Sequence, residues 1–472
     1  KEYEKELTCR GYYERFEAPF LAKSGKGNVL HIKASKGDVT EEYNITVKRT
    51  ASLQGLTVED QNGNPIAIDP SFNKTKTAYT VNVLDNNKTV TVKAVDPVET
   101  EYPDESQILF NGEASEDGSY KVTDLYIENG RIAASEDEVT DKTQLDAAGL
   151  KVLPGLVDIH SHGAVKHDFS DADVNGLKII LQYEKSQGIT SYCPTSMTLP
   201  KEELLKIFQT AKDVEQDETC ARIVGINMEG PFLDPSKKGA HVEGYIRKPD
   251  IEFFRECNEA AGGLIKLVTL APNMEGSEEF IRELHNEVVI SIGHTAADYN
   301  CAAEAMKQGA LHVTHLYNAM NPMGHREPGV IGAAADNENC MVELIGDGIH
   351  IHPVTVRNTF RLFGDSRVIL ISDSMMATGM ENGIYELGGQ EVTMKDRKAT
   401  LADGTIAGSA TCLFGCMKSV ISMGVPEREA ILAATANPAR SIGIYDEVGS
   451  LTPGKRADIV LTDEELNIVK VL

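Results

Sequence analysis

The chain has 472 residues, and its 72 Asp and Glu against 46 Lys and Arg give a formal net charge of −26. This acidic balance argues against nucleic acid, whose binding needs a basic surface, and against docking on an anionic membrane. A hydrophobic content of 41% with 25% charged residues is typical of globular proteins, and the length predicts several domains. No apolar run approaches the roughly 20 residues of a transmembrane helix.

The acidic charge and the histidines are concentrated beyond Ser106. Up to that residue there are 17 acidic and 14 basic residues, whereas the remainder has 55 acidic and 32 basic residues, a net of −23. Eleven of the twelve histidines lie between His160 and His352. Seven of the eight cysteines also follow Ser106, and no second pair at zinc-ligand spacing accompanies Cys412 and Cys416. We interpret them as free thiols, which favours a reducing compartment.

The first 97 residues are predicted to form β structure. Apolar and polar residues alternate over 27–49 and 78–95, and turn residues separate the runs. The segments ASLQGLTV, DPSF and AYTVNV resemble the cadherin-like or immunoglobulin-like β-sandwich modules of bacterial surface proteins. The closing pattern, YNITVKR, precedes the opening one. Residues 1–97 are therefore one sandwich in permuted order, which we favour, or two partial repeats.

A spacer or interaction domain without a ligand is the favoured role for this module, ahead of a carbohydrate-binding one. The stretch DPVETEYPDES is acidic and contains two prolines, a composition that suits an exposed connection. Residues 98–106 are accordingly predicted to be a linker.

From Val157 onward, strand-like apolar runs alternate with helix-like stretches. Eight such units over about 220 residues predict an α/β fold, a (β/α)8 TIM barrel with its chemistry at the C-terminal ends of the strands. The predicted strands lie at 156–159, 188–195, 222–228, 264–270, 288–292, 311–314, 342–346 and 368–372.

Residues of metal-ligand type stand at the ends of six of these runs. Imidazole and carboxylate groups suit Zn²⁺ and similar divalent ions. In His160-Ser161-His162 the period of two places both imidazoles on one side of an extended chain. An isolated HxH pair is weak evidence, but six strand ends in register predict a metal centre. The residues are His160, His162, Glu229, His294, His315, Asp347, His350 and Asp373.

These residues and their surroundings resemble the amidohydrolase superfamily and, within it, the N-acetylglucosamine-6-phosphate deacetylase family. The match runs from about Ile108 to Leu472. The resemblance implies metal-dependent hydrolysis of the acetamide of N-acetylglucosamine 6-phosphate, giving glucosamine 6-phosphate and acetate. It is carried by PGLVDIHSHG, MEGPFLDPSKKGAH, SIGHTAADY, VTHLYNAMNPMGHREPG, DGIHIHP and ISDSMMATG, of which EGPF, HLYNAM and REPG are specific to the deacetylase family.

The resemblance also implies a metal-ligand set. Glu229, His294 and His315 match the primary metal site of the family. The pair His160 and His162 is kept in this sequence, which implies a second site bridged by Glu229. Two divalent ions per subunit are expected, with zinc as the first choice and iron, manganese or cobalt as the others that accept these ligands.

The remaining functional residues also follow from the resemblance. Asp373 is expected to take a proton from the attacking water and pass it to the leaving amine. His241 is expected to bind substrate and to assist in stabilising the oxyanion. Relatives complete part of their phosphate site with a neighbouring subunit, which implies a homodimer. The residues expected to hold the sugar and its phosphate are His241, Asn318, Ala319, Arg326 and His350.

The superfamily also brings a second, smaller β-sandwich built from the two flanks of the barrel. Here it is predicted to comprise residues 107–153 and to be completed by about 385–408 and 447–472. The metal-dependent TIM-barrel catalytic domain is then expected over 154–446.

Two alternatives and the compartment stay open at this point. One alternative is an amidohydrolase that deacetylates a non-phosphorylated N-acetyl sugar or another N-acyl compound. The other is a catalytically inactive surface scaffold or adhesin, which should have lost ligands that this sequence retains. A phosphosugar substrate and free cysteines favour the cytoplasm. The N-terminal module and the start at Lys1 rather than Met favour a secreted or cell-surface protein.

Overall fold

The computed structural model describes residues 124–472 in full and, before residue 124, only the backbone of eleven strands. The chain divides into two units, Lys1–Gln107 and Ile108–Leu472. In the first unit the strands pair antiparallel in two sheets, of order β4-β3-β2-β8-β7 and β1-β9-β5-β6, and β10 pairs β11 in the second. The strands are β1 (Tyr3–Cys9), β2 (Tyr13–Glu17), β3 (Asn28–Lys36), β4 (Val39–Val47), β5 (Gly55–Glu59), β6 (Pro65–Ile66), β7 (Ile68–Asp69), β8 (Ala78–Val81), β9 (Lys88–Val95), β10 (Leu109–Phe110) and β11 (Glu113–Ala114).

The cadherin-like module predicted for residues 1–97 and the linker at 98–106 otherwise lie outside the described residues. Their organisation as one permuted sandwich or two partial repeats stays a prediction.

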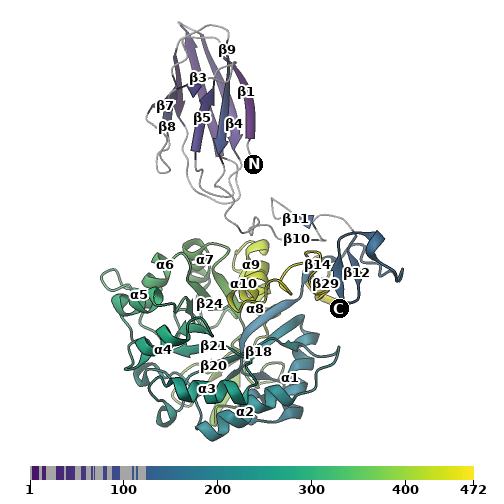
Figure 1. The fold of residues 1–472 in the computed structure, drawn as a ribbon, viewed down its shortest axis with the longest axis vertical. Helices are drawn as coiled ribbons and strands as arrows, with labels where there is room; N and C mark the ends of the chain where they lie inside the picture. The colour runs from purple at the N-terminus through teal and green to yellow at the C-terminus, as the bar shows by residue number, and fades with distance from the viewer. Residues whose placement is uncertain are drawn as a thin grey trace. The chain divides into compact units, whose positions relative to one another are not determined.

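A parallel barrel dominates the second unit and confirms the predicted fold class. Its strands pair in the chain order β15-β18-β20-β21-β22-β23-β24-β25, with the helices outside them (Figure 1). The strands are β15 (Leu156–Ser161), β18 (Ile189–Ser196), β20 (Ile226–Glu229), β21 (Ile265–Leu270), β22 (Val289–Ile292), β23 (His312–Val313), β24 (Met341–Ile345) and β25 (Val368–Ile371).

Helices follow the strands as the alternating pattern predicts. Several begin at a side-chain cap: Asp173 accepts from Asn175 N at the start of α1, and Asp298 accepts from Cys301 N at the start of α5. The helices are α1 (Val174–Ser186), α2 (Lys201–Asp213), α3 (Ile251–Ala260), α4 (Ser277–Leu284), α5 (Tyr299–Lys307), α6 (Gly329–Asp336), α7 (Pro353–Phe363), α8 (Leu413–Ser422), α9 (Glu427–Ala434) and α10 (Ala436–Ser441).

The barrel strands are buried on both faces, which explains why their sequences are continuous apolar runs. Every residue of β15, β18, β20 and β25 is buried. The ends of the sheet meet without a regular ladder: Asp373 N donates to His160 O at 2.9 Å, and His162 N donates to Ser374 O at 2.8 Å. These two bonds join the segments after the first and eighth strands.

The third strand differs from its prediction because it is interrupted. Residues 222–228 were expected to be continuous, but β19 (Arg222–Ile223) and β20 are separated by Val224-Gly225. β19 pairs with the middle of β18 and β20 with its end. A Cβ at Gly225 would lie 2.4 Å from Lys266 Cγ, so only glycine fits at the break.

Besides the antiparallel pair of β16 (Gly163–Ala164) and β17 (His167–Asp168), three small sheets accompany the barrel among the described residues. They are β12 (Tyr126–Glu128) with β13 (Arg131–Ala133), β14 (Lys151–Pro154) with β29 (Ile459–Thr462) and β30 (Ile468–Val471), and β26 (Gly383–Leu387) with β27 (Gln390–Lys395) and β28 (Lys398–Thr400). Ile132, Leu451, Ile459 and Leu461 share a buried cluster, which ties the two flanks of the barrel together. That all three sheets make up one small sandwich stays a prediction.

Among the described residues, no helix combines the length and apolar character that crossing a lipid bilayer requires.

An aromatic cluster anchors the segment that follows β20. Phe232 lies 5.2 Å from Phe280 of α4 and 5.9 Å from Phe253 of α3, measured between ring centroids. Phe254 lies 5.7 Å from Phe280, and each of these four rings is at most 2% exposed. Phe232 thus connects the third strand to the helical layer.

Replacing Phe280 by alanine should lower the free energy of unfolding of the barrel unit by about 3–5 kcal/mol, because it leaves a cavity between α3 and α4. Urea unfolding followed by circular dichroism measures the change. Leu362→Ala is the control, since Leu362 is 42% exposed and its loss should cost less than about 0.5 kcal/mol. Equal effects of the two substitutions would contradict the packing described.

Candidate metal centre and active site

Seven polar side chains from different strand ends meet at the carboxyl end of the barrel. His160 lies within β15 and Glu229 ends β20, while three others stand two residues beyond β22, β23 and β25. The structure therefore brings together residues more than 200 positions apart in the sequence. They are His160, His162, Glu229, His241, His294, His315 and Asp373, and none is more than 7% exposed.

The Glu229 carboxylate stands at the middle of this group. Burial by itself would raise its pKa, but the neighbouring histidines, His160 foremost, hold the pKa of Glu229 well below its usual range. One carboxylate therefore faces five imidazoles. Its Oε1 lies 3.0, 3.2 and 3.5 Å from Nε2 of His315, His294 and His160, and its Oε2 lies 3.4 Å from Nε2 of His162 and of His241.

Asp373 faces the pair of histidines from the first strand. Its Oδ1 lies 3.3 Å from His162 Nε2 and 3.6 Å from His160 Nε2. Although burial opposes it, hydrogen bonds to Asp373 and Glu229 raise the pKa of His162 to about 10. The two carboxylates thus require positive charge between them, from protons on the imidazoles or from a cation.

In four of the five imidazoles, the hydrogen-bond partner of Nδ1 determines whether Nε2, the nitrogen that faces Glu229, carries a lone pair or a proton. A histidine whose Nδ1–H donates to an acceptor keeps the Nε2 lone pair for a metal. Three of the rings have this arrangement, and all three turn Nε2 toward Glu229. His160 Nδ1 lies 2.9 Å from Glu343 Oε2, His162 Nδ1 lies 3.1 Å from Thr195 O, and His294 Nδ1 lies 2.8 Å from Lys237 O.

His241 is arranged in the opposite way. The backbone N–H of Thr198 donates to His241 Nδ1 at 3.2 Å, so the proton of the neutral ring lies on Nε2. Burial lowers the pKa of His241 to about 4, which keeps the ring neutral. Its ligand atom lies within 4.8 Å of those of Glu229 and His294, so distance alone would make it a metal ligand. The hydrogen bond from Thr198 makes it a donor instead.

The remaining imidazoles and Glu229 fit a divalent cation. His160, His162 and Glu229 place their ligand atoms within 4.8 Å of one another. His294 Nε2 and His315 Nε2 lie 3.1 Å apart, and His160 Nε2 is buried without a hydrogen-bond partner among the described residues. Neutral nitrogens turned toward one another in this way are stabilised when a cation accepts their lone pairs. Nitrogen and oxygen ligands together suit zinc and its neighbours.

Left-handed backbone conformations place several of these side chains. His294, His315 and Asp373 have φ values of 46°, 26° and 48°, and in the same loop as His315 the values are 79° for Tyr317 and 50° for Ala319. Residues other than glycine rarely adopt such values, and they cost about 1–3 kcal/mol each. The surrounding hydrogen bonds, such as Thr295 N to Ala319 O at 3.0 Å, hold this loop in place.

The residues predicted to bind the sugar and phosphate occupy the surrounding loops. Asp347 Oδ2 lies 2.8 Å from His350 Nδ1 and orients that ring. Asn318 Nδ2 is 3.4 Å from His315 O, which places Asn318 beside the metal-ligand cluster. Arg326 is exposed, and it forms no hydrogen bond or ion pair with any described residue. Its guanidinium is therefore available to an anion.

Sequence reasoning missed one residue of the site, Glu343. It is fully buried in β24, and its Oε2 accepts from His160 Nδ1 at 2.9 Å and from the backbone N–H of His315 at 3.1 Å. The sequence contained one indication of its role, a glutamate inside the otherwise apolar run VELIG. Because a buried carboxylate needs hydrogen-bond donors, such a residue points to polar partners nearby.

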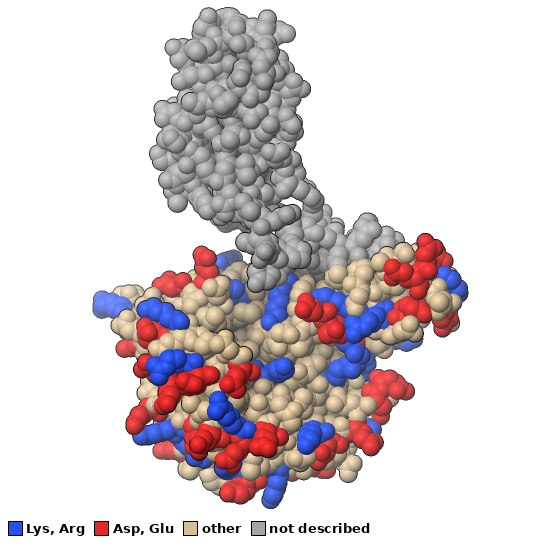
Figure 2. All heavy atoms as spheres, viewed as in Figure 1, with Lys and Arg blue, Asp and Glu red and all other residues tan. Residues whose placement is uncertain are grey.

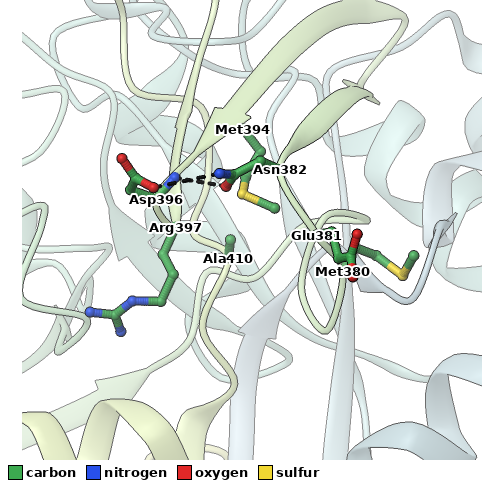
Figure 3. Close-up of a pocket in the computed structure, with 7 residues that line it drawn as sticks. All are labelled: Met380, Glu381, Asn382, Met394, Asp396, Arg397 and Ala410. Atoms are coloured by element: carbon green, nitrogen blue, oxygen red, sulfur yellow. Dashed lines mark hydrogen bonds between the residues drawn. The ribbon is translucent and has the colours of Figure 1, made fainter.

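A separate cavity of about 430 Å³ lies beside the β26–β28 sheet (Figure 3) and contains none of the clustered residues. It is lined by Met380, Glu381, Asn382, Met394, Asp396, Arg397 and Ala410. Asp396 N donates to Asn382 Oδ1 at 2.8 Å, so part of its polar lining is satisfied internally. The chemistry is therefore assigned to the strand ends and not to this cavity.

Comparison with known proteins places the chain in a family. A family model described as the amidohydrolase family matches residues 151–471. The chain belongs to the amidohydrolase family. It is 38% identical over 368 residues to N-acetylglucosamine-6-phosphate deacetylase of Bacillus subtilis, covering 77% of this chain and 93% of that protein. It is also 32% identical over 360 residues to N-acetylgalactosamine-6-phosphate deacetylase of Escherichia coli O157:H7, covering 76% and 95%.

Solved structures give the same relationship. N-acetyl-D-glucosamine-6-phosphate deacetylase from Mycobacterium smegmatis matches with a TM-score of 0.68 at 32% identity, covering 74% of this chain and 93% of that one. An Asp-to-Ala mutant of that enzyme, in complex with N-acetyl-D-glucosamine-6-phosphate, matches with a TM-score of 0.69 at 33% identity, covering 74% and 92%. The predicted resemblance to amidohydrolases of the deacetylase type is confirmed, and the chain is a hydrolase of this metal-dependent family.

Exchanging His294 for asparagine should weaken zinc binding by more than about 100-fold, since it removes a nitrogen ligand beside Glu229. His241→Asn should keep the metal content of the wild type, because the hydrogen bond from Thr198 makes His241 a donor. Elemental analysis by mass spectrometry after dialysis against a fixed zinc concentration measures both. Loss of metal from the His241 variant would refute the distinction drawn between the two rings.

Proposed function

We propose that the site hydrolyses the acetamide of N-acetylglucosamine 6-phosphate to glucosamine 6-phosphate and acetate. The observation that carries the proposal is the Glu229 carboxylate surrounded by the four imidazoles of ligand type and by His241, with an additional carboxylate, Asp373, in the same pocket. The deacetylases of this specificity that align over nearly their whole length support the choice of substrate.

Two divalent ions per chain are part of the proposal, with zinc ahead of iron, manganese and cobalt. Glu229, His294 and His315 would hold one ion. Glu229 would also bridge to a second ion held by the pair His160 and His162. When bound, such ions lower the pKa of a water toward neutrality and polarise a carbonyl oxygen.

The chain's own residues then carry the proton and the substrate. Asp373 would accept a proton from the attacking water and pass it to the nitrogen of the leaving amine. Its Oδ1 lies 3.3 Å from His162 Nε2, so Asp373 would receive the proton directly beside the proposed metal ligands. His241 Nε2–H would donate to the carbonyl oxygen as negative charge develops there. The nearly complete burial of both groups excludes bulk water, which strengthens these interactions.

Arg326, His350, Asn318 and Ala319 are proposed to hold the sugar and its phosphate. The exposed guanidinium of Arg326 donates in a planar fork that matches two phosphate oxygens. Asp347 fixes the His350 ring through Nδ1, which leaves the Nε2 lone pair of the neutral ring to accept a hydrogen bond from a hydroxyl of the sugar.

The phosphate group is expected to decide between the main proposal and a deacetylase of non-phosphorylated N-acetyl compounds. With the wild-type enzyme, kcat/KM should be higher for N-acetylglucosamine 6-phosphate than for N-acetylglucosamine. Arg326→Ala should lower it about 10–100-fold for the phosphorylated sugar, because a charge-assisted hydrogen bond is lost, and leave the other nearly unchanged. Steady-state kinetics of acetate release measures both. Faster turnover of the unphosphorylated sugar would overturn the proposal.

The 6-phosphate of N-acetylgalactosamine is the third substrate for this comparison, because an N-acetylgalactosamine-6-phosphate deacetylase aligns with 76% of this chain. The relatives named N-acetylglucosamine-6-phosphate deacetylase align at 32–38% identity and the one named for N-acetylgalactosamine 6-phosphate at 32%, so the assay and not the identity decides between the two epimers.

Asp373→Asn should lower kcat about 10²–10⁴-fold, because the amide cannot accept and return the proton. The metal content should stay at the wild-type value, since the amide keeps the shape of the side chain. Stopped assays of acetate release and elemental analysis on the same preparation measure the two quantities. An unchanged kcat in the Asp373→Asn variant would show that Asp373 does not carry the proton. A wild-type enzyme without activity would instead favour the inactive-scaffold alternative.

A homodimer and a cytoplasmic location complete the proposal. Arg326 stands on an exposed loop with Met323, which is 53% exposed, so a second subunit has room to cover this phosphate side of the site. Analytical ultracentrifugation tests the dimer. The cysteines of the described residues are all free, which fits a reducing compartment, whereas the predicted N-terminal module favours a surface location. Cell fractionation tests the compartment.

A further inference from the structure

A single oxygen atom of Glu343 contacts two metal-ligand candidates, which come from two different strands. Its Oε2 lies 2.9 Å from His160 Nδ1 and accepts from the backbone N–H of His315 at 3.1 Å. His160 comes from the first strand and His315 from the loop after the sixth, whereas Glu343 belongs to β24, the seventh. The same carboxylate oxygen therefore sets both the tautomer of one ring and the backbone position of another.

The contact to His160 determines which nitrogen of that ring faces the pocket. A carboxylate is only an acceptor, so the proton of the neutral ring must lie on Nδ1 and the lone pair on Nε2. His160 is completely buried, and its Nε2 has no hydrogen-bond partner among the described residues. Without Glu343 the ring could turn over or take the other tautomer, and in either case the lone pair would leave the pocket.

The contact to His315 acts on the backbone instead. His315 has φ of 26°, which an L-residue adopts only when its surroundings compensate the strain. The bond from its N–H to Glu343 is one such compensation. Its side chain, unlike that of His160, has no partner at Nδ1 among the described residues, so Glu343 positions this ligand through the main chain alone.

We propose that Glu343 is a positioning residue that strengthens metal binding at the second site, the one built on His160 and His162. The inference rests on the proposed function, because it assumes the two-ion arrangement. Glu343 touches neither substrate nor ion; it acts by fixing the His160 lone pair. Loss of the carboxylate should therefore weaken the second ion much more than the ion held by Glu229, His294 and His315, to which Glu343 contributes only through the backbone.

Glu343→Leu is the decisive variant. Leucine removes the acceptor for His160 completely, and because it also leaves the buried Nδ1–H of His160 and N–H of His315 without that partner, a loss of stability is expected beside the effect on metal binding. Glu343→Gln retains one oxygen that can accept and should restore part of the binding. The matched controls are Glu184→Leu and Glu184→Gln. Glu184 is also fully buried, and its carboxylate has no hydrogen-bond partner among the described residues, so it accepts from none of the ligand candidates.

The measurement is zinc stoichiometry by elemental analysis, together with isothermal titration of the metal-stripped full chain with zinc. We expect two ions in the wild type and in both Glu184 variants. In Glu343→Leu the dissociation constant of one ion should rise about 10–100-fold while the other is retained, and Glu343→Gln should lie between. Circular dichroism verifies that each variant is folded.

Two results would overturn the inference. One is wild-type affinity for both ions in Glu343→Leu and Glu343→Gln; the other is equal weakening of both ions in Glu343→Gln, which would indicate a general structural role. Should Glu343→Leu fail to fold, the glutamine variant decides by the same criterion. The proposed function is tested separately, on the wild-type protein, by the binding of two zinc ions and the release of acetate from the phosphosugar. A failure of the Glu343 inference is therefore distinguishable from a failure of the proposed function.

Discussion

The buried carboxylate of Glu229 is the interaction on which the arrangement of the site depends. A carboxylate with 2% exposure would be protonated or lost from the core unless positive charge or hydrogen-bond donors surrounded it. Five imidazoles do so, each with a ring nitrogen within 3.5 Å of one of its oxygens. Because the rings come from different strands and loops, their interactions with the Glu229 carboxylate hold several strand ends close together.

Electrostatic need alone does not decide what each imidazole does. The five rings lie at similar distances from Glu229, yet for four of them the partner of the opposite nitrogen decides whether the ring offers Glu229 and the pocket a lone pair or a proton. Acceptors behind His160, His162 and His294 turn lone pairs inward, whereas the Thr198 N–H behind His241 turns a proton inward. Division of labour in the pocket is therefore set by groups that do not face it.

The sequence was sufficient for the barrel and for most of the residues that cluster at its carboxyl end, for a physical reason. Strands covered on both faces are continuous apolar runs, so residues such as Glu229 and Asp373 stand out where a run ends. Glu343 was missed because it lies inside the run VELIG, where a polar residue is ordinarily a packing exception. The break at Gly225 was missed as well, because it depends on Lys266, a neighbour 41 positions away in the chain.

The net charge of the chain shows where attraction for an anionic substrate has to arise. The part beyond Ser106 carries −23, and acidic and basic side chains are interspersed over the face seen in Figure 2, so no broad basic field is visible there. Long-range steering of a sugar phosphate toward such a surface is weak or repulsive. Recognition of the proposed sugar phosphate would then have to act within a few ångströms, which is the range of the exposed guanidinium of Arg326 and of the proposed metal ions. The acidic charge that argues against nucleic acid does not argue against a small phosphate ester.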